Sequence, residues 1–205
     1  MLIFGAAALT LGLALVLPPA FAVEEMREFN DDGKNAGKTK SCPKGTRFSE
    51  RKRSCVKTSC AGGKIWSSGA DDCIDGRSAA LSDEDLYLAA GELVVDARYA
   101  EALPLLFRIK DRNNPQVLNL IGYSTRKLGD IDKGIDYYHR ALALDPGYTK
   151  ARQYLGEAYL LKNDVGKAKE QLEEIADRCG GPCEDYELLV RAIAAHVSGE
   201  PQTDW

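Results

Sequence analysis

Histidine is scarce in this sequence, which contains two histidines, His139 and His196, among 205 residues. Both lie in helical patterns away from clustered carboxylates, so no metal site is expected. The sequence also lacks a glycine-rich phosphate loop and a recognisable set of nucleophile, base and orienting residue. We therefore predict a protein that is not an enzyme, has no cofactor and no metal, and does not bind nucleic acid.

Charged side chains are absent before Glu24, and no second long apolar run follows the first one. The first 22 residues, MLIFGAAALTLGLALVLPPAFA, end in the small-residue pattern Ala20-Phe21-Ala22. This pattern predicts a signal peptide (1–22), a mature protein that starts at Val23 and a periplasmic or secreted location. An uncleaved membrane anchor is the alternative, because the apolar run is nearly long enough to span a bilayer. The lack of Lys or Arg before the run departs from the usual signal, unless the true start lies upstream.

Six cysteines make an even count, which in an oxidising compartment predicts disulfides. After a polar segment expected to be disordered (23–41), residues 42–73 contain two similar units, CPKGTRFSERKRSC and CAGGKIWSSGADDC, 18 residues apart. Each unit is predicted to be a short hairpin that needs a covalent bond, since its core is small. Pairing within units gives Cys42–Cys55 and Cys60–Cys73; pairing between units gives Cys42–Cys60 and Cys55–Cys73. The gaps of 12, 4 and 12 residues do not suit zinc, which favours C-x2-C pairs.

Charge is unevenly distributed along the chain. Residues 23–80 hold 12 Lys and Arg against 9 Asp and Glu, whereas residues 81–205 hold 15 against 22. The stretch from Lys34 to Lys57 contains nine basic residues and one acidic residue, Glu50. A charge run is usually a solvated face, and contact with an anionic polymer or surface is the sharper alternative.

A helical repeat follows a linker (74–82). Residues 119–146 and 153–180 align at an offset of 34, so that Gly122 meets Gly156 and Asp130 meets Asp164. Small residues at such positions let helices approach closely, and larger apolar residues recur at helical spacing. Asp130, Asp164 and the Asn114-Pro115 pair are placed to begin helices.

This pattern resembles the tetratricopeptide repeat family, of a secreted or periplasmic bacterial type with an added cysteine-rich module. The resemblance implies an all-α solenoid of about three helical hairpins (83–114, 115–148 and 149–180) and a small disulfide-bonded N-terminal module. It assigns repeat packing to Gly122, Ala141, Pro146, Gly156, Tyr159 and Ala168. Leu118 and Arg152 stand where tryptophan is usual in the family.

The first of these hairpins is the weakest, because its spacing to the next unit is 32 residues. Ser82 is placed to cap its first helix, and residues 97–110 are expected to form the second helix, kinked at Pro104. After the last hairpin, residues 184–197 are predicted to form an amphipathic capping helix, followed by a disordered tail (198–205).

Cys179 and Cys183 flank Gly180, Gly181 and Pro182 at the junction with the capping helix. A disulfide here would fix the angle of that helix. A thiol-disulfide enzyme is the less favoured interpretation, because such centres usually have C-x-x-C in a βαβ setting.

The family's groove-facing positions assign a concave surface to the first helix of each hairpin. These positions fall on Gln116, Asn119, Tyr123 and Arg126, and on Lys150, Gln153, Glu157 and Leu160. We predict that Asn119, Tyr123, Arg126, Gln153 and Glu157 bind a peptide segment of an envelope protein. We expect these side chains to be exposed, so that replacing them spares folding. Binding of an envelope polymer through the basic cysteine module is the alternative function, and the oligomeric state is left open.

Overall fold

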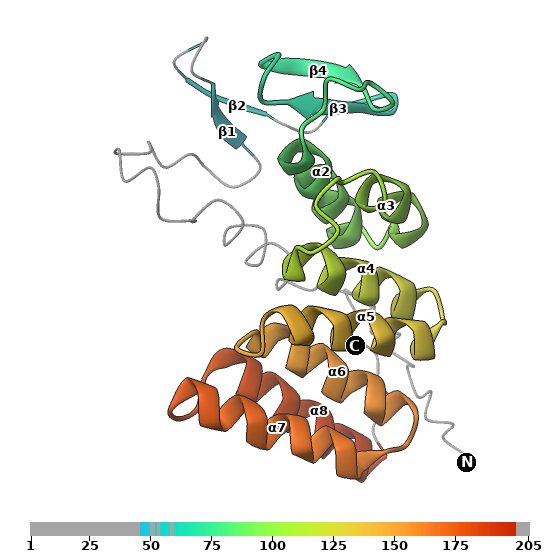
Figure 1. Cartoon of the computed structure of the whole chain (residues 1–205), viewed down its shortest axis with the longest axis vertical. Coiled ribbons are helices and arrows are strands. Elements are labelled where there is room, and N and C mark those ends of the chain that lie inside the picture. The colour runs from blue at the N-terminus through green and yellow to red at the C-terminus, as the bar shows by residue number, and fades with distance from the viewer. Residues whose placement is uncertain (1–45, 50–51, 53, 58–59, 200–205) are drawn as a thin grey trace, which may run out of the picture.

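The computed structural model describes residues 46–49, 52, 54–57 and 60–199. Helical hairpins stack along the long axis of the molecule, and two β-hairpins lie at one end of the stack (Figure 1). The predicted signal peptide, the 23–41 segment, Cys42 and residues 200–205 lie outside the described residues. Among the residues that are described, no helix is long and apolar enough to cross a membrane.

The cysteine module forms two antiparallel hairpins, β1 (Thr46–Ser49) with β2 (Ser54–Lys57) and β3 (Lys64–Ser67) with β4 (Asp72–Asp75). Their registers agree with the internal repeat, because Phe48 pairs with Cys55 in one hairpin and Trp66 with Cys73 in the other. A disulfide joins Cys60 to Cys73, which rules out pairing between the units. Cys55 is also disulfide-bonded, and its predicted partner Cys42 lies outside the described residues.

The second hairpin packs against α2 (Asp83–Val95) through Ile65, which is buried with Leu81 in the main core. Asp85 joins the two elements. Its carboxylate accepts hydrogen bonds from the backbone N–H of Ser68 at 2.9 Å and from the Ser68 hydroxyl at 2.8 Å. It also accepts from the Ser82 N–H in a capping box. One carboxylate therefore starts the first helix and attaches the β-hairpin to it.

Asp85→Asn is expected to lower the melting temperature at neutral pH, and the difference from the wild type should shrink in acid. Burial raises the pKa of Asp85, but the hydrogen bonds from Ser68 and Ser82 outweigh burial and hold the pKa below its ordinary value of 3.8. A carboxyl with a lowered pKa stabilises the fold above that value, and the stabilisation is lost as the pH falls through the folded-state pKa. Thermal melting at pH 7, 5 and 3 measures the effect.

Glu84→Gln is the matched control, because it makes the same charge change in the same helical turn without touching the hairpin. A gap between wild type and Asp85→Asn that stays constant down to pH 3 would contradict the assignment of these hydrogen bonds to the ionised carboxylate.

The prediction of an all-α tetratricopeptide-like solenoid is confirmed for the helical part of the chain. The hairpins are α2 with α3 (Tyr99–Leu106), α4 (Pro115–Lys127) with α5 (Ile131–Leu144), and α6 (Thr149–Leu161) with α7 (Val165–Cys179). Side chains of Ser82, Asn114, Asp130 and Asp164 all accept backbone hydrogen bonds at helix starts, as their positions predict. The helix α3 is shorter than expected and ends two residues after Pro104.

Glycine allows two close approaches between helices. A Cβ at Gly122 would lie 2.9 Å from the Tyr138 ring and 3.1 Å from the Gly134 carbonyl oxygen, so Gly122 sets the contact of α4 with α5. A Cβ at Gly156 would lie 2.6 Å from Leu189 of α8 (Glu184–Ser198). Gly156 therefore serves the contact with the capping helix, whereas the sequence suggested a role inside the last hairpin. Ala141, Tyr159 and Ala168 are buried, and the Pro146 carbonyl accepts hydrogen bonds from Arg152 and Arg178.

The capping helix α8 packs against both α6 and α7. A disulfide between Cys179 and Cys183 closes the loop that leads into it, in agreement with the sequence prediction. Gly180 adopts a positive φ of 66° and ends α7, as glycine does at many helix C-termini. Leu189 of α8 is fully buried, so the capping helix covers the open edge of the last hairpin.

Candidate functional site

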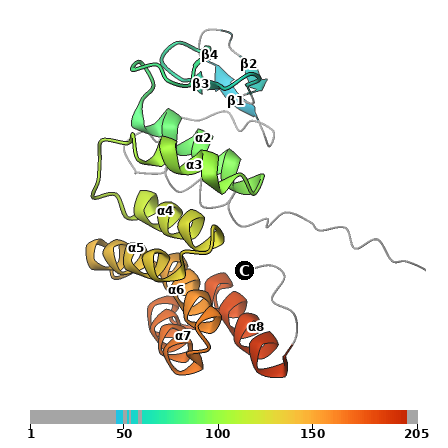
Figure 2. The same ribbon diagram turned by 90° about the vertical axis from the view of Figure 1, so that its right-hand side faces the viewer.

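The predicted binding residues come from two neighbouring helices, α4 and α6, which are the first helices of successive hairpins (Figure 2). Asn119, Tyr123 and Arg126 follow one another on one side of α4, and Gln153 and Glu157 lie one turn apart on α6. The structure brings this set together as predicted. We call the set, with its ring neighbours Tyr99, Tyr138 and Tyr154, the α4–α6 wall.

The expectation that these side chains are exposed is wrong. Relative exposure is 0% for Asn119, 5% for Tyr123, 3% for Arg126, 3% for Gln153 and 6% for Glu157. Leu160 is buried as well, whereas Gln116 and Lys150 are half-buried. Large side chains on α4 and α6 contact one another between adjacent hairpins. These contacts cover the side chains that were expected to face solvent.

An ion pair forms the centre of the α4–α6 wall. Arg126 Nη2 lies 2.9 Å from Glu157 Oε2, and the side chains are 0% and 8% exposed. Gln153 Nε2 donates a hydrogen bond to the other oxygen of Glu157. Arg126 Nε donates to the hydroxyl of Tyr138 at 3.3 Å. The pair therefore connects two successive hairpins through four side chains.

Burial has opposite electrostatic consequences for the two partners. Burial raises the pKa of the Glu157 carboxyl, and the neighbouring Arg126, Lys127 and Gln153 oppose this shift. Burial lowers the pKa of the Arg126 guanidinium, but Tyr138 and Glu157 outweigh it and the net direction is upward. Arg126 therefore keeps its charge, and Glu157 is the member of the pair whose ionisation depends on its partner.

Tyrosine rings surround the ion pair. Tyr123 and Tyr154 lie 4.8 Å apart by ring centroids, and Tyr99 and Tyr138 extend the cluster at 5.9 Å from Tyr123 and 6.2 Å from Tyr154, respectively. The Arg126 guanidinium lies 5.3 Å from the centre of the Tyr123 ring, a favourable cation–π distance. The sequence analysis missed Tyr99 and Tyr154. Tyr154 directly follows the predicted Gln153, but its aromatic contact with Tyr123 depends on residues 31 positions apart.

Arg126 Nη1 and Gln153 Oε1 are buried polar atoms of the wall that have no hydrogen-bond partner among the described residues. One is a donor and the other is an acceptor. Leaving such groups unpaired is costly in a folded protein. The α4–α6 wall thus has unused hydrogen-bonding capacity of both kinds.

Comparison with known proteins agrees with this architecture. The tetratricopeptide repeat family model matches residues 126–192. Over these residues the chain is similar in sequence to tetratricopeptide repeats, and its helical hairpins have the fold of that family. Over 65 residues the chain is 37% identical to the tetratricopeptide repeat domain-containing protein PYG7, chloroplastic, of Arabidopsis thaliana. That segment is 32% of this chain and 22% of PYG7, so the chain spans less than a quarter of its relative.

Two solved structures share the tetratricopeptide fold at low identity. The Yersinia enterocolitica type III secretion chaperone SycD, in complex with a peptide of the translocator YopD, superposes with a TM-score of 0.50 at 19% identity over 60% of this chain and 95% of SycD. The first tetratricopeptide domain of Spaghetti (RPAP3), bound to the HSP90 peptide SRMEEVD, gives 0.50 at 20% identity over 57% of this chain and 96% of that domain.

A second ion pair joins the last helical hairpin to the capping helix. Lys150 Nζ lies 3.0 Å from Asp185 Oδ1, and the side chains are 13% and 12% exposed. The Thr149 hydroxyl donates to the other Asp185 oxygen at 2.6 Å. Lys150 is one of the predicted groove positions. Its positive charge, like that of Arg126, is paired with a carboxylate of the same chain, here Asp185.

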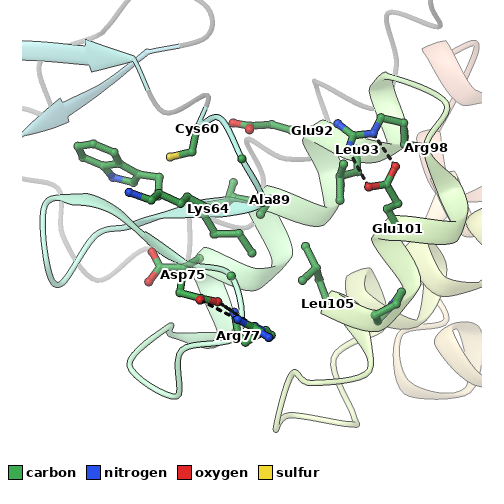
Figure 3. Close-up of a pocket in the computed structure, with 18 of the residues that line it drawn as sticks. Cys60, Lys64, Asp75, Arg77, Ala89, Glu92, Leu93, Arg98, Glu101 and Leu105 are labelled. Carbon is green, nitrogen blue, oxygen red and sulfur yellow. Dashed lines mark hydrogen bonds and ion pairs between the residues drawn. The ribbon is translucent and has the colours of Figure 1, made fainter.

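A cleft of about 930 Å³ is lined by residues of the second β-hairpin and of α2 and α3 (Figure 3). Its apolar lining includes Leu88, Leu93 and Leu105. Its lining also contains charges of both signs, from Lys64, Arg77, Arg98 and Arg108 and from Asp75, Asp85, Glu92, Asp96 and Glu101. Asp75 pairs with Arg77, and Arg98 pairs with Glu101. Since the five acidic residues of the lining outnumber the four basic ones, the cleft does not have the character of a polyanion site.

No group of three or more His, Cys, Asp or Glu residues that could hold a metal occurs in the part of the chain that the structure describes.

Proposed function

We propose that this protein is a tetratricopeptide scaffold that binds peptide segments of other proteins at the α4–α6 wall. The observation that carries the proposal is the wall itself, where predicted groove residues of two repeats meet with a hydrogen-bond donor and an acceptor left unpaired. Proteins with this fold bind peptides in two of the solved structures, one of YopD and one of HSP90. Aromatic and arginine side chains are also the types that dominate binding energy at interfaces.

The proposed setting is the periplasm or the outside of the cell, with partners in the envelope. The apolar N-terminus with its Ala20-Phe21-Ala22 pattern and the even number of cysteines support this setting. Intact-mass measurement of exported protein is expected to give a chain that begins at Val23. A retained Met1 in a membrane fraction would contradict export as a cleaved protein.

Site-specific photo-crosslinking tests the binding site. A benzophenone side chain placed at Gln116, a half-buried predicted groove position on α4, is expected to trap members of a random dodecapeptide library. The same group at Asp136, exposed on α5, is the control, because α5 is the second helix of its hairpin. Equal trapping at both positions, or stronger trapping at Asp136, would place binding outside the α4–α6 wall.

A further inference from the structure

Every cation at a predicted groove position on α4 and α6 is matched by a carboxylate from the next repeat or cap. Arg126 of α4 pairs with Glu157 of α6 at 2.9 Å, and Lys150 of α6 pairs with Asp185 of α8 at 3.0 Å. The remaining predicted positions are uncharged: Gln116, Asn119, Tyr123, Gln153 and Leu160. The predicted groove positions, together with Asp185, therefore carry no net charge.

Binding of an acidic ligand to such a wall is unfavourable, because its carboxylate competes with Glu157 for Arg126. To reach the guanidinium of Arg126, a ligand carboxylate must either displace Glu157 or lie beside it. Displacement leaves Glu157 buried without its partner, and coexistence places two carboxylates around one cation. Both alternatives are costly where the side chains are 0% and 8% exposed, because an uncompensated buried charge is strongly disfavoured.

A neutral amide suits the same place. The unpaired Arg126 Nη1 can donate to a carbonyl oxygen, and the unpaired Gln153 Oε1 can accept from an N–H. A peptide bond offers one of each. The rings of Tyr123 and Tyr154, 4.8 Å apart, provide apolar surface for a neighbouring uncharged side chain. Both polar atoms are shielded from solvent in this conformation, so a ligand reaches them when the surrounding side chains rearrange.

We infer that the α4–α6 wall selects uncharged peptide segments, which it holds through main-chain amides, and that Glu157 and Asp185 determine this specificity by excluding acidic side chains and C-terminal carboxylates. This inference rests on the proposed function, since it names the partner chemistry of that site. Glu157 and Asp185 act through Arg126 and Lys150, whose charges they neutralise.

Two matched peptide pools test the inference. One pool contains amidated decapeptides of uncharged residues; the other has a free C-terminus and aspartate at two positions. Each pool is passed over immobilised full-length protein, and retention is quantified by mass spectrometry. The wild type is expected to retain the neutral pool about tenfold better, which corresponds to about 1.4 kcal/mol.

Removing the carboxylate of Glu157 or of Asp185 should weaken the preference for the neutral peptide pool. Glu157→Gln and Asp185→Asn are each expected to shift the ratio of retained pools about tenfold toward the acidic pool, because a cation loses its partner. Glu174→Gln is the control. Glu174 lies on α7 and pairs with Arg178 of the same helix and with Arg152 of α6, which also hydrogen-bonds to Gln171 of α7. Circular dichroism melting establishes that each variant is folded, and Asp185→Asn provides the test if Glu157→Gln is unstable.

The outcomes separate the inference from the proposed function. Equal retention of both pools by the wild type, or better retention of the acidic pool, overturns the inference and leaves peptide binding standing. An unchanged ratio in every folded carboxylate variant also overturns it. Retention of neither pool overturns the proposed function, and the inference with it.

Discussion

Replacing Arg126 by alanine is expected to lower the free energy of unfolding by about 3–5 kcal/mol, the usual cost of removing one partner from a buried ion pair. The substitution leaves Glu157 buried at 6% exposure with the neutral Gln153 as its remaining side-chain hydrogen-bond donor among the described residues. It also removes a hydrogen bond to Tyr138 and a cation–π contact with Tyr123. Equilibrium denaturation in urea measures the loss.

The pair of Arg98 with Glu101 provides the control. Its side chains are 50% and 59% exposed, so Arg98→Ala is expected to cost less than about 1 kcal/mol. If Arg126→Ala costs no more than Arg98→Ala, the ion pair is solvated and the wall is an open groove. That result would restore the expectation drawn from the sequence.

The decrease in the free energy of unfolding caused by Arg126→Ala should also depend on pH. Burial already raises the pKa of Glu157, and removing Arg126 takes away a group that opposes this shift. A carboxyl with a raised pKa in the folded state stabilises the fold at low pH, and that contribution is lost as the pH rises through the folded-state pKa. Arg126→Ala should therefore be closer to the wild type at pH 5 than at pH 7.

The helices could be predicted from the sequence because their signals are local. Asn114, Asp130 and Asp164 each act on the next two or three residues, and the structure shows them accepting those hydrogen bonds. The β-hairpins were predictable for the same reason, since each consists of a short repeated unit. The repeat left two symmetric pairings open, and the structure contains the disulfide between Cys60 and Cys73 from the first of them.

Burial of the α4–α6 wall could not be predicted in this way. The resemblance to a family placed Arg126 and Glu157 on neighbouring helices, but whether they face a solvent-filled groove depends on how their side chains pair. Arg126 and Glu157 are 31 residues apart, and no periodic pattern relates them. The same holds for Asp85: the sequence indicated Ser82 as a helix cap, whereas the hydrogen bonds that Asp85 accepts from Ser68 depend on the docking of a separate hairpin.

Contacts made by small residues are similarly ambiguous in a sequence. Gly122 and Gly156 align in the repeat, yet the first lies against α5 of its own hairpin and the second against α8. The alignment indicates that both positions must be small. It does not indicate which helix approaches, because the capping helix adds a neighbour that the repeat pattern does not contain.

Gly156→Leu is accordingly expected to destabilise the protein by about 1–3 kcal/mol or more, through overpacking against the capping helix. A Cβ at position 156 would lie 2.6 and 2.7 Å from the two methyl carbons of Leu189. A methyl group at the end of a side chain could usually move aside, but Leu189 is 0% exposed and is therefore enclosed by other protein groups. The strain should therefore push α8 away from α6 and weaken the contacts of Asp185.

Gly166→Leu is the matched control, since Gly166 also lies in a helix but is exposed, and its nearest neighbour to an added Cβ is a side-chain oxygen at 3.6 Å. That substitution should be neutral or stabilising, because leucine favours a helix more than glycine does.

The decisive measurement is a double-mutant cycle with Leu189→Ala, which alone should cost about 2–5 kcal/mol by leaving a cavity. If α8 packs as described, the leucine at 156 fills that cavity, and the double variant is more stable than the sum of the two single losses allows. Strictly additive losses would show that positions 156 and 189 do not meet, and that the capping helix lies elsewhere on the last repeat.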